Sequence, residues 1–270
     1  MKQSLCTITK SKEAMPGVCL LWIKAPHIAR SAQPGQFITV RCDDLPLRRP
    51  FSIHLTLQDE IALLFKIKGK GTAWLSRRRE GDAINVIGPL GNTFTVRPDA
   101  RNLLLIAGGI GIAPLVFLVQ RIGPEHQITL VHGASSAAQL YPFSPPDKAS
   151  RDVCSLPHNI QLIPITEDGS SGRKGKATDV LPHFLPSFDQ MYACGPVEMY
   201  QAMAAMHDTC VAAKDHALLE NCQVSLEIRM GCGLGACFGC TINTKKGPKR
   251  VCCDGPIFKF GEIIWPEVRL

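Results

Sequence analysis

Hydrophobic residues follow a strand-like pattern in the first part of the chain. Short runs rich in β-branched and aromatic residues occur at 36–41 and 61–67, and turn residues such as those at 89–92 separate them. Short strands without strong helical periodicity predict a small antiparallel β barrel. Residues 72–76 form one short predicted helix within it. We predict that this domain spans residues 1–98.

The pattern then becomes that of an α/β domain. Residues 103–107 form an unbroken apolar run, typical of a strand buried on both faces of a parallel sheet, and a helical stretch follows at 114–122. Further apolar runs lie at 128–131, 160–163 and 190–193. Alternating strands and helices predict a doubly wound parallel sheet in residues 99–212. A surface loop is predicted at 142–146.

The last segment, residues 213–270, is rich in cysteine and glycine. A segment of this size has little apolar core of its own, so a metal cluster is expected to organise it. We therefore predict a third, small C-terminal lobe.

One uncharged stretch, residues 103–119, raises the question of a membrane span. A spanning helix needs about 20 apolar residues, and this stretch is shorter and interrupted by glycines and Pro114. The N-terminus also lacks the apolar run of a secretory signal. We expect no membrane span and a cytoplasmic location.

The chain has a formal net charge of +7. A nucleic-acid partner is one reading of this charge. The basic residues are dispersed, however, except at 77–79 and 245–250. Phosphate-bearing cofactors or an anionic cluster would also neutralise part of the charge, so we predict no nucleic-acid binding.

Five of the twelve cysteines fall between residues 232 and 253. Cys232, Cys237 and Cys240 have the C-x4-C-x2-C spacing of plant-type [2Fe–2S] proteins. Glycines around them permit the tight loop that such a cluster requires. A zinc site is the alternative, although structural zinc usually shows paired cysteine knuckles, often with histidine.

The fourth ligand has two candidates, the adjacent Cys252 and Cys253. The six cysteines at 6, 19, 42, 154, 210 and 222 are expected to be small buried or incidental residues.

Two glycine-bearing strand ends indicate a dinucleotide site. Gly109 and Gly111 follow a predicted buried strand and precede a helix, where backbone N–H groups and the helix dipole favour a pyrophosphate. Cys194, Gly195 and Pro196 follow another predicted strand of the same domain.

A flavin site is indicated in the barrel by Arg49, Pro50, Phe51 and Ser52. An arginine can contact a pyrophosphate, and a hydroxyl can hydrogen-bond an isoalloxazine edge. Alone, this tetrapeptide would more often be an ordinary strand start.

The order of several motifs along the chain resembles that in the ferredoxin–NADP reductase superfamily. These motifs are Arg49 to Ser52, Gly71-Thr72, Gly88 to Asn92, Gly108 to Leu115 and Tyr192 to Pro196. The cysteine-rich tail further resembles that of electron-transfer subunits of NAD-dependent dihydroorotate dehydrogenases.

The resemblance implies FAD on the barrel, NAD(H) on the α/β domain and a [2Fe–2S] cluster in the C-terminal lobe. The implied FAD contacts are Arg49, Pro50, Phe51, Ser52, Leu64, Phe65, Lys66, Gly71 and Thr72. The implied cluster ligands are Cys232, Cys237, Cys240 and, from the Val-Cys-x-Asp-Gly-Pro pattern, Cys252. Cys253 stands where the family often has a lysine, and the segment between Cys240 and Cys252 is short for the family.

In that family an FMN-containing partner oxidises dihydroorotate in pyrimidine biosynthesis, and electrons pass through the cluster and FAD to NAD+. The resemblance implies a heterotetramer of two subunits of each kind, and no dihydroorotate site in this chain. The basic group at 245–250 is hypothesised to dock the partner, the alternative being a solvated loop.

Three alternatives stay open. The chain also resembles the small subunits of flavin-based ferredoxin:NADP oxidoreductases and the reductase components of sulfide dehydrogenases and hydrogenases. A redox-sensing or purely structural iron–sulfur protein is the non-enzymatic reading. The absence of an arginine in 132–136, the turn predicted after the second strand of the α/β domain, favours NAD over NADP, although Arg173 or Lys174 could approach from another loop.

Overall fold

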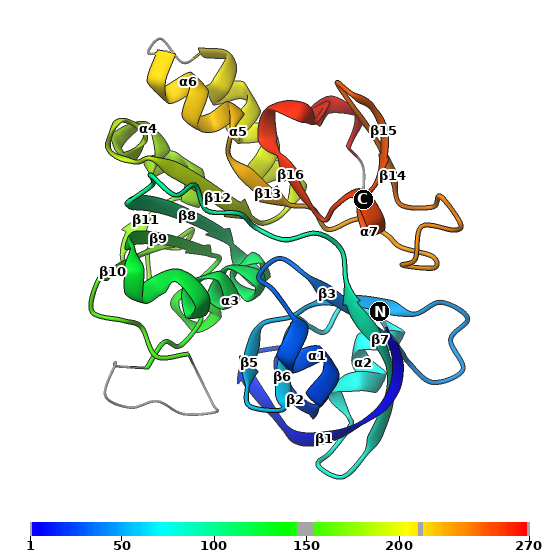
Figure 1. Ribbon diagram of the computed structural model, residues 1–270. Helices are drawn as coiled ribbons and strands as arrows, with labels where there is room; N and C mark the ends of the chain where they lie inside the picture. The colour runs from blue at the N-terminus through cyan, green and yellow to red at the C-terminus, as the bar shows by residue number, and fades with distance from the viewer. Residues whose placement is uncertain (1, 145–153, 210–212, 269–270) are drawn as a thin grey trace.

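The computed structural model describes residues 2–144, 154–209 and 213–268. The N-terminal part is an antiparallel sheet of seven strands in the order β4-β3-β7-β1-β2-β6-β5, curled into a barrel at the bottom of Figure 1. Phe51 and Phe65, on β4 and β6, have ring centroids 5.3 Å apart, where the two ends of the sheet meet. The elements of this part are β1 (Lys2–Met15), β2 (Val18–Lys24), α1 (Pro26–Ser31), β3 (Phe37–Arg41), β4 (Arg49–Ser52), β5 (Leu55–Leu57), β6 (Glu60–Lys66), α2 (Lys70–Ser76) and β7 (Ala83–Leu90).

Strand β2 is buried on both of its faces. Leu21 and Ile23 lie in the core of the barrel, whereas Leu20 and Trp22 pack with the α/β domain. The alternation of an antiparallel strand normally leaves one face for water. Here the second face is an interdomain interface, which explains the continuous apolar run in this strand.

The second sheet also has seven strands, in the order β11-β10-β9-β8-β12-β13-β16. All neighbouring pairs are parallel except β13 with β16. Its elements, with the helices between them, are β8 (Asn102–Gly108), η1 (Gly109–Gly111), α3 (Ile112–Ile122), η2 (Gly123–Glu125), β9 (Gln127–Ala134), η3 (Ala137–Gln139), β10 (Ile160–Thr166), β11 (Arg173–Lys174), η4 (Ala177–Val180), α4 (Leu181–Phe184), η5 (Leu185–Ser187), β12 (Gln190–Cys194), α5 (Val197–Thr209), α6 (Ala213–Glu220) and β13 (Gln223–Ser225).

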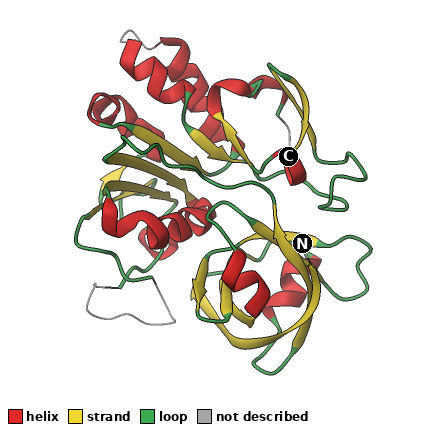
Figure 2. Cartoon of the chain, viewed as in Figure 1, coloured by secondary structure: helices red, strands yellow, loops and turns green. Residues whose placement is uncertain are grey.

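Helices cover both faces of this sheet, as Figure 2 shows. On β8, Leu103 and Leu105 face the side covered by α3, and Leu104 and Ile106 face the side covered by α4 and α5. The predicted doubly wound sheet is therefore confirmed, with one antiparallel strand, β16, at its edge.

The C-terminal segment is built into the α/β domain. It contributes β14 (Thr241–Thr244), β15 (Gly247–Arg250), α7 (Val251–Asp254), β16 (Ile257–Lys259), η6 (Phe260–Glu262) and η7 (Trp265–Glu267). Strand β16 pairs with β13, and Phe258 and Trp265 belong to the same core as Leu104. The shared core therefore holds much of this segment, in addition to the cluster that is expected to organise it.

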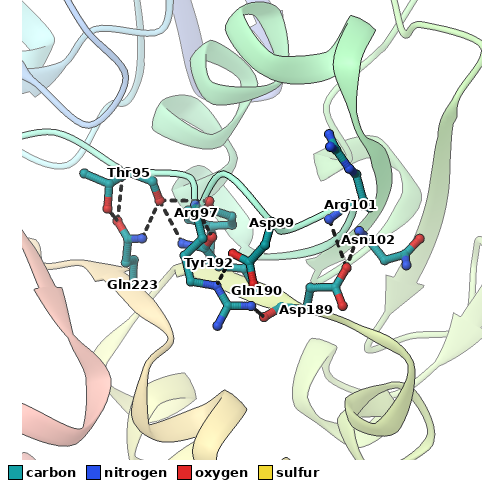
Figure 3. A network of polar contacts seen from close by, with 9 residues as sticks. All are labelled: Thr95, Arg97, Asp99, Arg101, Asn102, Asp189, Gln190, Tyr192 and Gln223. Atoms are coloured by element: carbon teal, nitrogen blue, oxygen red, sulfur yellow. Dashed lines mark hydrogen bonds and ion pairs between the residues drawn. The ribbon is translucent and has the colours of Figure 1, made fainter.

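The linker between barrel and α/β domain is tied down by a polar network (Figure 3). The carbonyl of Thr95 accepts hydrogen bonds from Gln190 Nε2 at 2.8 Å, the Tyr192 hydroxyl at 3.0 Å and Gln223 Nε2 at 2.6 Å. Asp189 accepts from the N–H groups of Arg101 and Asn102. The linker thereby crosses β12 and β13 in a defined register.

Most element predictions agree with the structure. The helix predicted at 114–122 begins two residues earlier, at Ile112. Of the loop predicted at 142–146, Pro145 and Pro146 lie outside the described residues, as does Cys210. The cysteines at 6, 19, 42, 154 and 222 are buried, as expected. No helix in the described parts of the chain is long and apolar enough to cross a membrane.

Candidate functional site

The predicted cluster ligands lie in and beside an irregular loop. Residues 226–240, between β13 and β14, form neither helix nor strand and contain Cys232, Cys237 and Cys240. The N–H of Leu234 points at Cys232 Sγ at 3.3 Å. The N–H groups of Cys232 and Gly239 both point at Cys237 Sγ at 3.4 Å. Backbone donors aimed at sulfur are what a thiolate-bound cluster requires.

The fourth thiol comes from α7. Cys252 Sγ accepts the N–H of Gly235 at 3.2 Å, and the N–H of Cys252 points at Cys240 Sγ at 3.4 Å. Cys252 is 2% exposed, whereas Cys253 is exposed. Among the described residues, Cys253 Sγ has a sulfur contact with Cys252 at 3.6 Å and no backbone donor. This geometry supports Cys252 as the fourth ligand.

The loop also changes the acidity of its thiols. Burial by itself raises the pKa of Cys232, but the N–H of Leu234 and further donors of the loop outweigh it and lower the pKa from 9.0 to about 6. Burial, with the neighbouring thiols of Cys240 and Cys253, raises the pKa of Cys252. A bound iron deprotonates its thiol ligands outright, so the raised pKa of Cys252 does not conflict with ligation.

No three His, Cys, Asp or Glu side chains of the described residues converge on one metal-ion position. A [2Fe–2S] cluster does not require such a set, because four thiolates are shared between two irons. The backbone donors and the four sulfurs fit this group.

The cluster loop and α7 are seated on the barrel. A Cβ on Gly233 would lie 2.8 Å from Thr39 Cγ2 of β3. Asn92, just after β7, donates from Nδ2 to the carbonyls of Asp254 and Ile257, and its Oδ1 accepts the N–H of Ile257. The segment that follows Cys252 is therefore clamped to the barrel beside β3.

The predicted flavin residues come together where β4 packs against β6 at the closure of the barrel. Arg49, Pro50, Phe51 and Ser52 form the edge strand β4, Leu64, Phe65 and Lys66 end β6, and Gly71 and Thr72 lie in α2. The rings of Phe51 and Phe65 face the barrel core.

Arg49 is arranged to meet an anion. Its side chain covers Gly71 so closely that a Cβ there would lie 3.0 Å from Arg49 Nε. Its hydrogen bonds go to the carbonyls of Leu47 and Arg48, and the ion pairs found in the described residues do not include it. A guanidinium without a carboxylate partner at a free strand edge fits a pyrophosphate.

The two glycine-bearing strand ends are packed against each other. Strands β8 and β12 are parallel neighbours, and a Cβ on Gly111 would lie only 2.1 Å from the carbonyl oxygen of Cys194. A Cβ on Gly195 would lie 3.2 Å from Gly108 Cα. Gly109 has a φ of +52° and open space around it. This is the carboxyl edge at which the strand order reverses, where open α/β sheets bind ligands.

Residues that the sequence did not single out complete this edge. His132 was expected in a turn but lies within β9, buried, with Nε2 3.2 Å from the carbonyl oxygen of Gly109. His54 and Tyr141 are likewise buried next to α3. A histidine next to an apolar run is a signal that the sequence offers for a buried polar residue. The sequence does not show which group that residue hydrogen-bonds.

The basic group at 245–250 does not act as one patch. Arg250 donates to the carbonyl of Gly235 at 2.9 Å and lies over the Phe238 ring, in the cluster loop. Lys246 lies at the turn of the β14–β15 hairpin, at the opposite end from the cluster, and pairs with Glu262 at 2.6 Å. The cluster loop also exposes two large apolar side chains among its ligands, Leu234 at 41% and Phe238 at 64%, whereas its exposed charged residues, Glu227 and Arg229, precede the first ligand.

Comparison with known proteins gives concordant matches. A family model for the iron–sulfur cluster binding domain of dihydroorotate dehydrogenase B matches residues 227–264, and one for an oxidoreductase NAD-binding domain matches residues 105–205. The electron transfer subunit of dihydroorotate dehydrogenase B (NAD(+)) of Desulforamulus reducens is 36% identical over 93% of this chain and 94% of its own length. The corresponding subunit of a Geobacillus species is 35% identical over 98% and 99%.

Two solved structures show similar folds. One is an NADH-dependent reduced ferredoxin-NADP oxidoreductase, studied for flavin-based electron bifurcation, with a TM-score of 0.80 and 30% identity over 98% of this chain and 91% of that one. The other is a ferredoxin NADP+ reductase from Neisseria gonorrhoeae with bound FAD and NADP, with a TM-score of 0.62 and 19% identity over 77% and 92%.

Proposed function

Since the chain belongs to the family of electron transfer subunits of dihydroorotate dehydrogenase B, we propose that it carries electrons between a catalytic partner subunit and NAD(H) in pyrimidine biosynthesis. It is an NAD-linked oxidoreductase subunit of this family. The observation that carries the proposal is the cluster loop, in which backbone N–H groups point at four cysteine sulfurs beside the barrel.

The cofactors of the proposal are FAD, NAD(H) and a [2Fe–2S] cluster. FAD would be held along β4 and α2, the dinucleotide at the carboxyl edge of β8 and β12, and the cluster by the four thiols at 232, 237, 240 and 252. We propose three functional parts with boundaries at 98/99 and 212/213. The C-terminal part remains a functional unit in this proposal although two of its strands, β13 and β16, belong to the α/β sheet.

A flavin supplies the exchange between hydride, which carries two electrons, and a cluster that accepts one at a time. The protein positions these groups and sets their environment. Arg49 neutralises pyrophosphate charge, the loop N–H groups stabilise negative charge on the cluster sulfurs, and Gly109 and Gly111 let a dinucleotide approach the backbone.

The partner in this proposal is the FMN-containing catalytic subunit, which would hold the dihydroorotate site, in a complex of two subunits of each kind in the cytoplasm. The exposed Leu234 and Phe238 lie in the cluster loop, where electrons have to enter. We propose this apolar patch, rather than the hairpin turn at Lys245 and Lys246, as the centre of the docking surface.

NAD is the proposed dinucleotide, as in the names of the relatives. Arg173 and Lys174 are exposed on β11. The segment that leads to β11 lies beside residues 132–136, because the N–H of Asp168 donates to the carbonyl of Ser135. These two basic side chains could contact a 2′-phosphate, so the test includes NADPH beside NADH.

The experiment is an anaerobic titration of the purified chain with NADH and with NADPH, followed by visible absorbance and low-temperature EPR. Flavin bleaching by NADH together with a [2Fe–2S]⁺ signal supports the proposal. A protein that binds a cluster but no flavin, or whose cluster NADH cannot reduce, contradicts it and favours the sensing reading.

A second candidate function is the small subunit of a ferredoxin:NADP oxidoreductase, because a structure of that type matches 98% of the chain. Isolation of the native complex separates the two candidates. An FMN-binding partner that reduces the chain with dihydroorotate supports the first, and a ferredoxin-dependent partner supports the second.

A further inference from the structure

Three buried polar side chains occupy the junction between the barrel and the α/β domain. His54, between β4 and β5, is 0% exposed, His132 of β9 is 1% exposed, and Tyr141, in the loop after η3, is 3% exposed. Buried polar groups are costly unless all are hydrogen-bonded. These three satisfy one another and the backbone around η1 and α3.

The direction of each hydrogen bond follows from the partners. His54 Nδ1 lies 2.9 Å from the carbonyl oxygen of Ala113, which can only accept, so Nδ1 carries the proton. In the neutral ring Nε2 then accepts from the Tyr141 hydroxyl, at 3.0 Å. The same hydroxyl oxygen accepts the N–H of Cys154, also at 3.0 Å.

His132 carries its proton on the other nitrogen. Nε2 donates to the carbonyl oxygen of Gly109 at 3.2 Å, and Nδ1 accepts the N–H of Tyr141 at 3.4 Å. Burial lowers the pKa of both histidines to about 4, which keeps these neutral tautomers in place. The chain of bonds therefore has one consistent pattern of donors and acceptors.

The hydrogen bonds of these three side chains hold both ends of the glycine-containing loop 109–113. His132 holds the carbonyl of Gly109, His54 holds the carbonyl of Ala113, and Tyr141 connects the two histidines. His54 is the only one of the three that belongs to the barrel. The barrel therefore contacts the carboxyl edge of β8 through a fully satisfied polar chain.

Helix α3, which follows the loop, is attached to the barrel along its length. Gln120 donates to the carbonyl of Thr56 at 2.8 Å and accepts its N–H at 3.1 Å. Phe117 lies within the hydrophobic core of the barrel. The barrel thus sets the position of the whole helix, and His54 sets the end nearest the proposed dinucleotide.

We propose that His54, Tyr141 and His132 are positioning residues that hold the loop 109–113 at a set distance from the barrel for hydride exchange between NAD(H) and FAD. This inference rests on the proposed function. Hydride exchange needs reacting atoms about 3–3.5 Å apart, and a displacement of about 1 Å is enough to slow such a step about a hundredfold. The three side chains themselves touch neither reacting atom.

The test uses two variants that break the hydrogen bond between His54 and Tyr141. Tyr141→Phe removes the hydroxyl, which bonds His54 Nε2 and also accepts the N–H of Cys154. His54→Asn keeps a donor near the place of Nδ1 for Ala113, but the shorter side chain places no acceptor at the position of Nε2 for Tyr141. Gln120→Ala is the matched control, because it removes two interdomain hydrogen bonds at the far end of α3, away from the loop.

The first measurement is amide hydrogen exchange in residues 103–119 of the cofactor-loaded protein without nucleotide. Exchange in 109–113 is expected to be about tenfold faster in Tyr141→Phe and His54→Asn, and unchanged in Gln120→Ala. The second is the stopped-flow rate of flavin reduction by NADH. This rate is expected to fall about tenfold in Tyr141→Phe and His54→Asn, because the approach geometry of the reacting atoms is lost. The affinity for NADH should stay within about threefold of wild type, because the binding contacts remain.

The inference would be overturned if Tyr141→Phe and His54→Asn fold but keep wild-type amide exchange and wild-type flavin reduction rates. It would also be overturned if Gln120→Ala changed both rates as much as these two variants do. If one variant fails to fold, the other decides. If NADH does not reduce the flavin of the wild-type protein, the proposed function is contradicted instead. The exchange measurement then still decides whether His54, Tyr141 and His132 hold the loop 109–113.

Discussion

At the residue scale, neighbouring cysteines of the cluster region have different surroundings. Cys252 is buried and accepts the N–H of Gly235, whereas Cys253 is exposed and lies so near Gly235 that a Cβ there would be 2.4 Å from its sulfur. A short helix turns adjacent side chains in different directions, so only one of two adjacent thiols faces the loop. The structure therefore assigns different expected roles to residues of the same type.

Replacing Cys252 by serine is expected to abolish cluster binding, whereas Cys253→Ser should retain it. Serine replaces the soft thiolate ligand that iron–sulfur clusters require with an oxygen, and only Cys252 lies among the backbone donors. Iron and acid-labile sulfide content, with the visible spectrum, measure this. Retained cluster in Cys252→Ser and loss in Cys253→Ser would mean that the ligand is misassigned.

The buried histidines predict a dependence of stability on pH. His54 and His132 have a pKa of about 4 in the folded protein, against an ordinary value of 6.5, because burial disfavours the charged ring. The unfolded chain therefore binds more protons between these values, so stability is complete above pH 6.5 and is lost as pH falls toward 4. Each histidine contributes roughly 3 kcal/mol over this window.

Thermal unfolding of wild type and His54→Asn between pH 7.5 and 4.5 measures this effect. The melting temperature of the wild type is expected to fall more steeply with decreasing pH than that of the variant, because asparagine does not titrate. Parallel curves would show that His54 is not held neutral by its surroundings.

At the scale of elements, the strand ends matter more than the strands. The β8 and β12 ends approach so closely that Gly111 has no room for a side chain, and the β7 end carries Asn92 into the segment after Cys252. Both contacts involve backbone atoms, which have little freedom to move away. Each element therefore presents its site residues by its end rather than by its length.

Gly111→Ala is expected to weaken NAD(H) binding at least about tenfold, because the new methyl group would meet the Cys194 carbonyl at 2.1 Å and displace the loop. Gly123→Ala, at the other end of α3, where φ is −51°, is the control and should bind normally. Nucleotide titration by fluorescence measures both. Unchanged affinity in Gly111→Ala would show that the loop does not contact the dinucleotide.

Asn92→Ala should loosen the cluster segment from the barrel. It removes three side-chain hydrogen bonds to residues 254–257, which contribute about 2–3 kcal/mol in total. The expected result is a faster loss of cluster absorbance during incubation with a chelator, with FAD still bound. An unchanged rate of loss would mean that the shared core, and not this clamp, protects the cluster.

At the scale of the whole molecule, the three proposed functional parts share two seven-stranded sheets, and β14 and β15 form a separate two-stranded sheet. The barrel and the α/β sheet meet through apolar faces of β2 and β6 on one side and α3 on the other, and the C-terminal segment extends the α/β sheet while resting on the barrel. In Figure 1 the orange and red segment lies above the barrel and beside β12 and β13. All three proposed cofactor sites consequently border the barrel.

The exposed apolar residues of the cluster loop lead to a prediction about where the partner subunit docks on this chain. Leu234→Asp is expected to weaken association with the catalytic subunit at least about tenfold, which corresponds to about 1.4 kcal/mol, since it places a charge in an apolar interface. Lys246→Glu is the control and should change affinity less than about twofold. Weaker binding in Lys246→Glu, with normal binding in Leu234→Asp, would instead support docking by the basic group.

The sequence by itself determined the classes of structure and chemistry. Hydrophobic periodicity indicated a barrel followed by an α/β domain, and the C-x4-C-x2-C spacing with its glycines indicated a cluster, because local geometry imposes such patterns on contiguous residues. Only the tertiary structure decided which residues from distant segments meet. Asn92 holds residues 254–257, His54 reaches Ala113, and β16 joins β13. These contacts depend on how the sheets and the linker pack in space, and a single buried asparagine or histidine carries no pattern that names its partner.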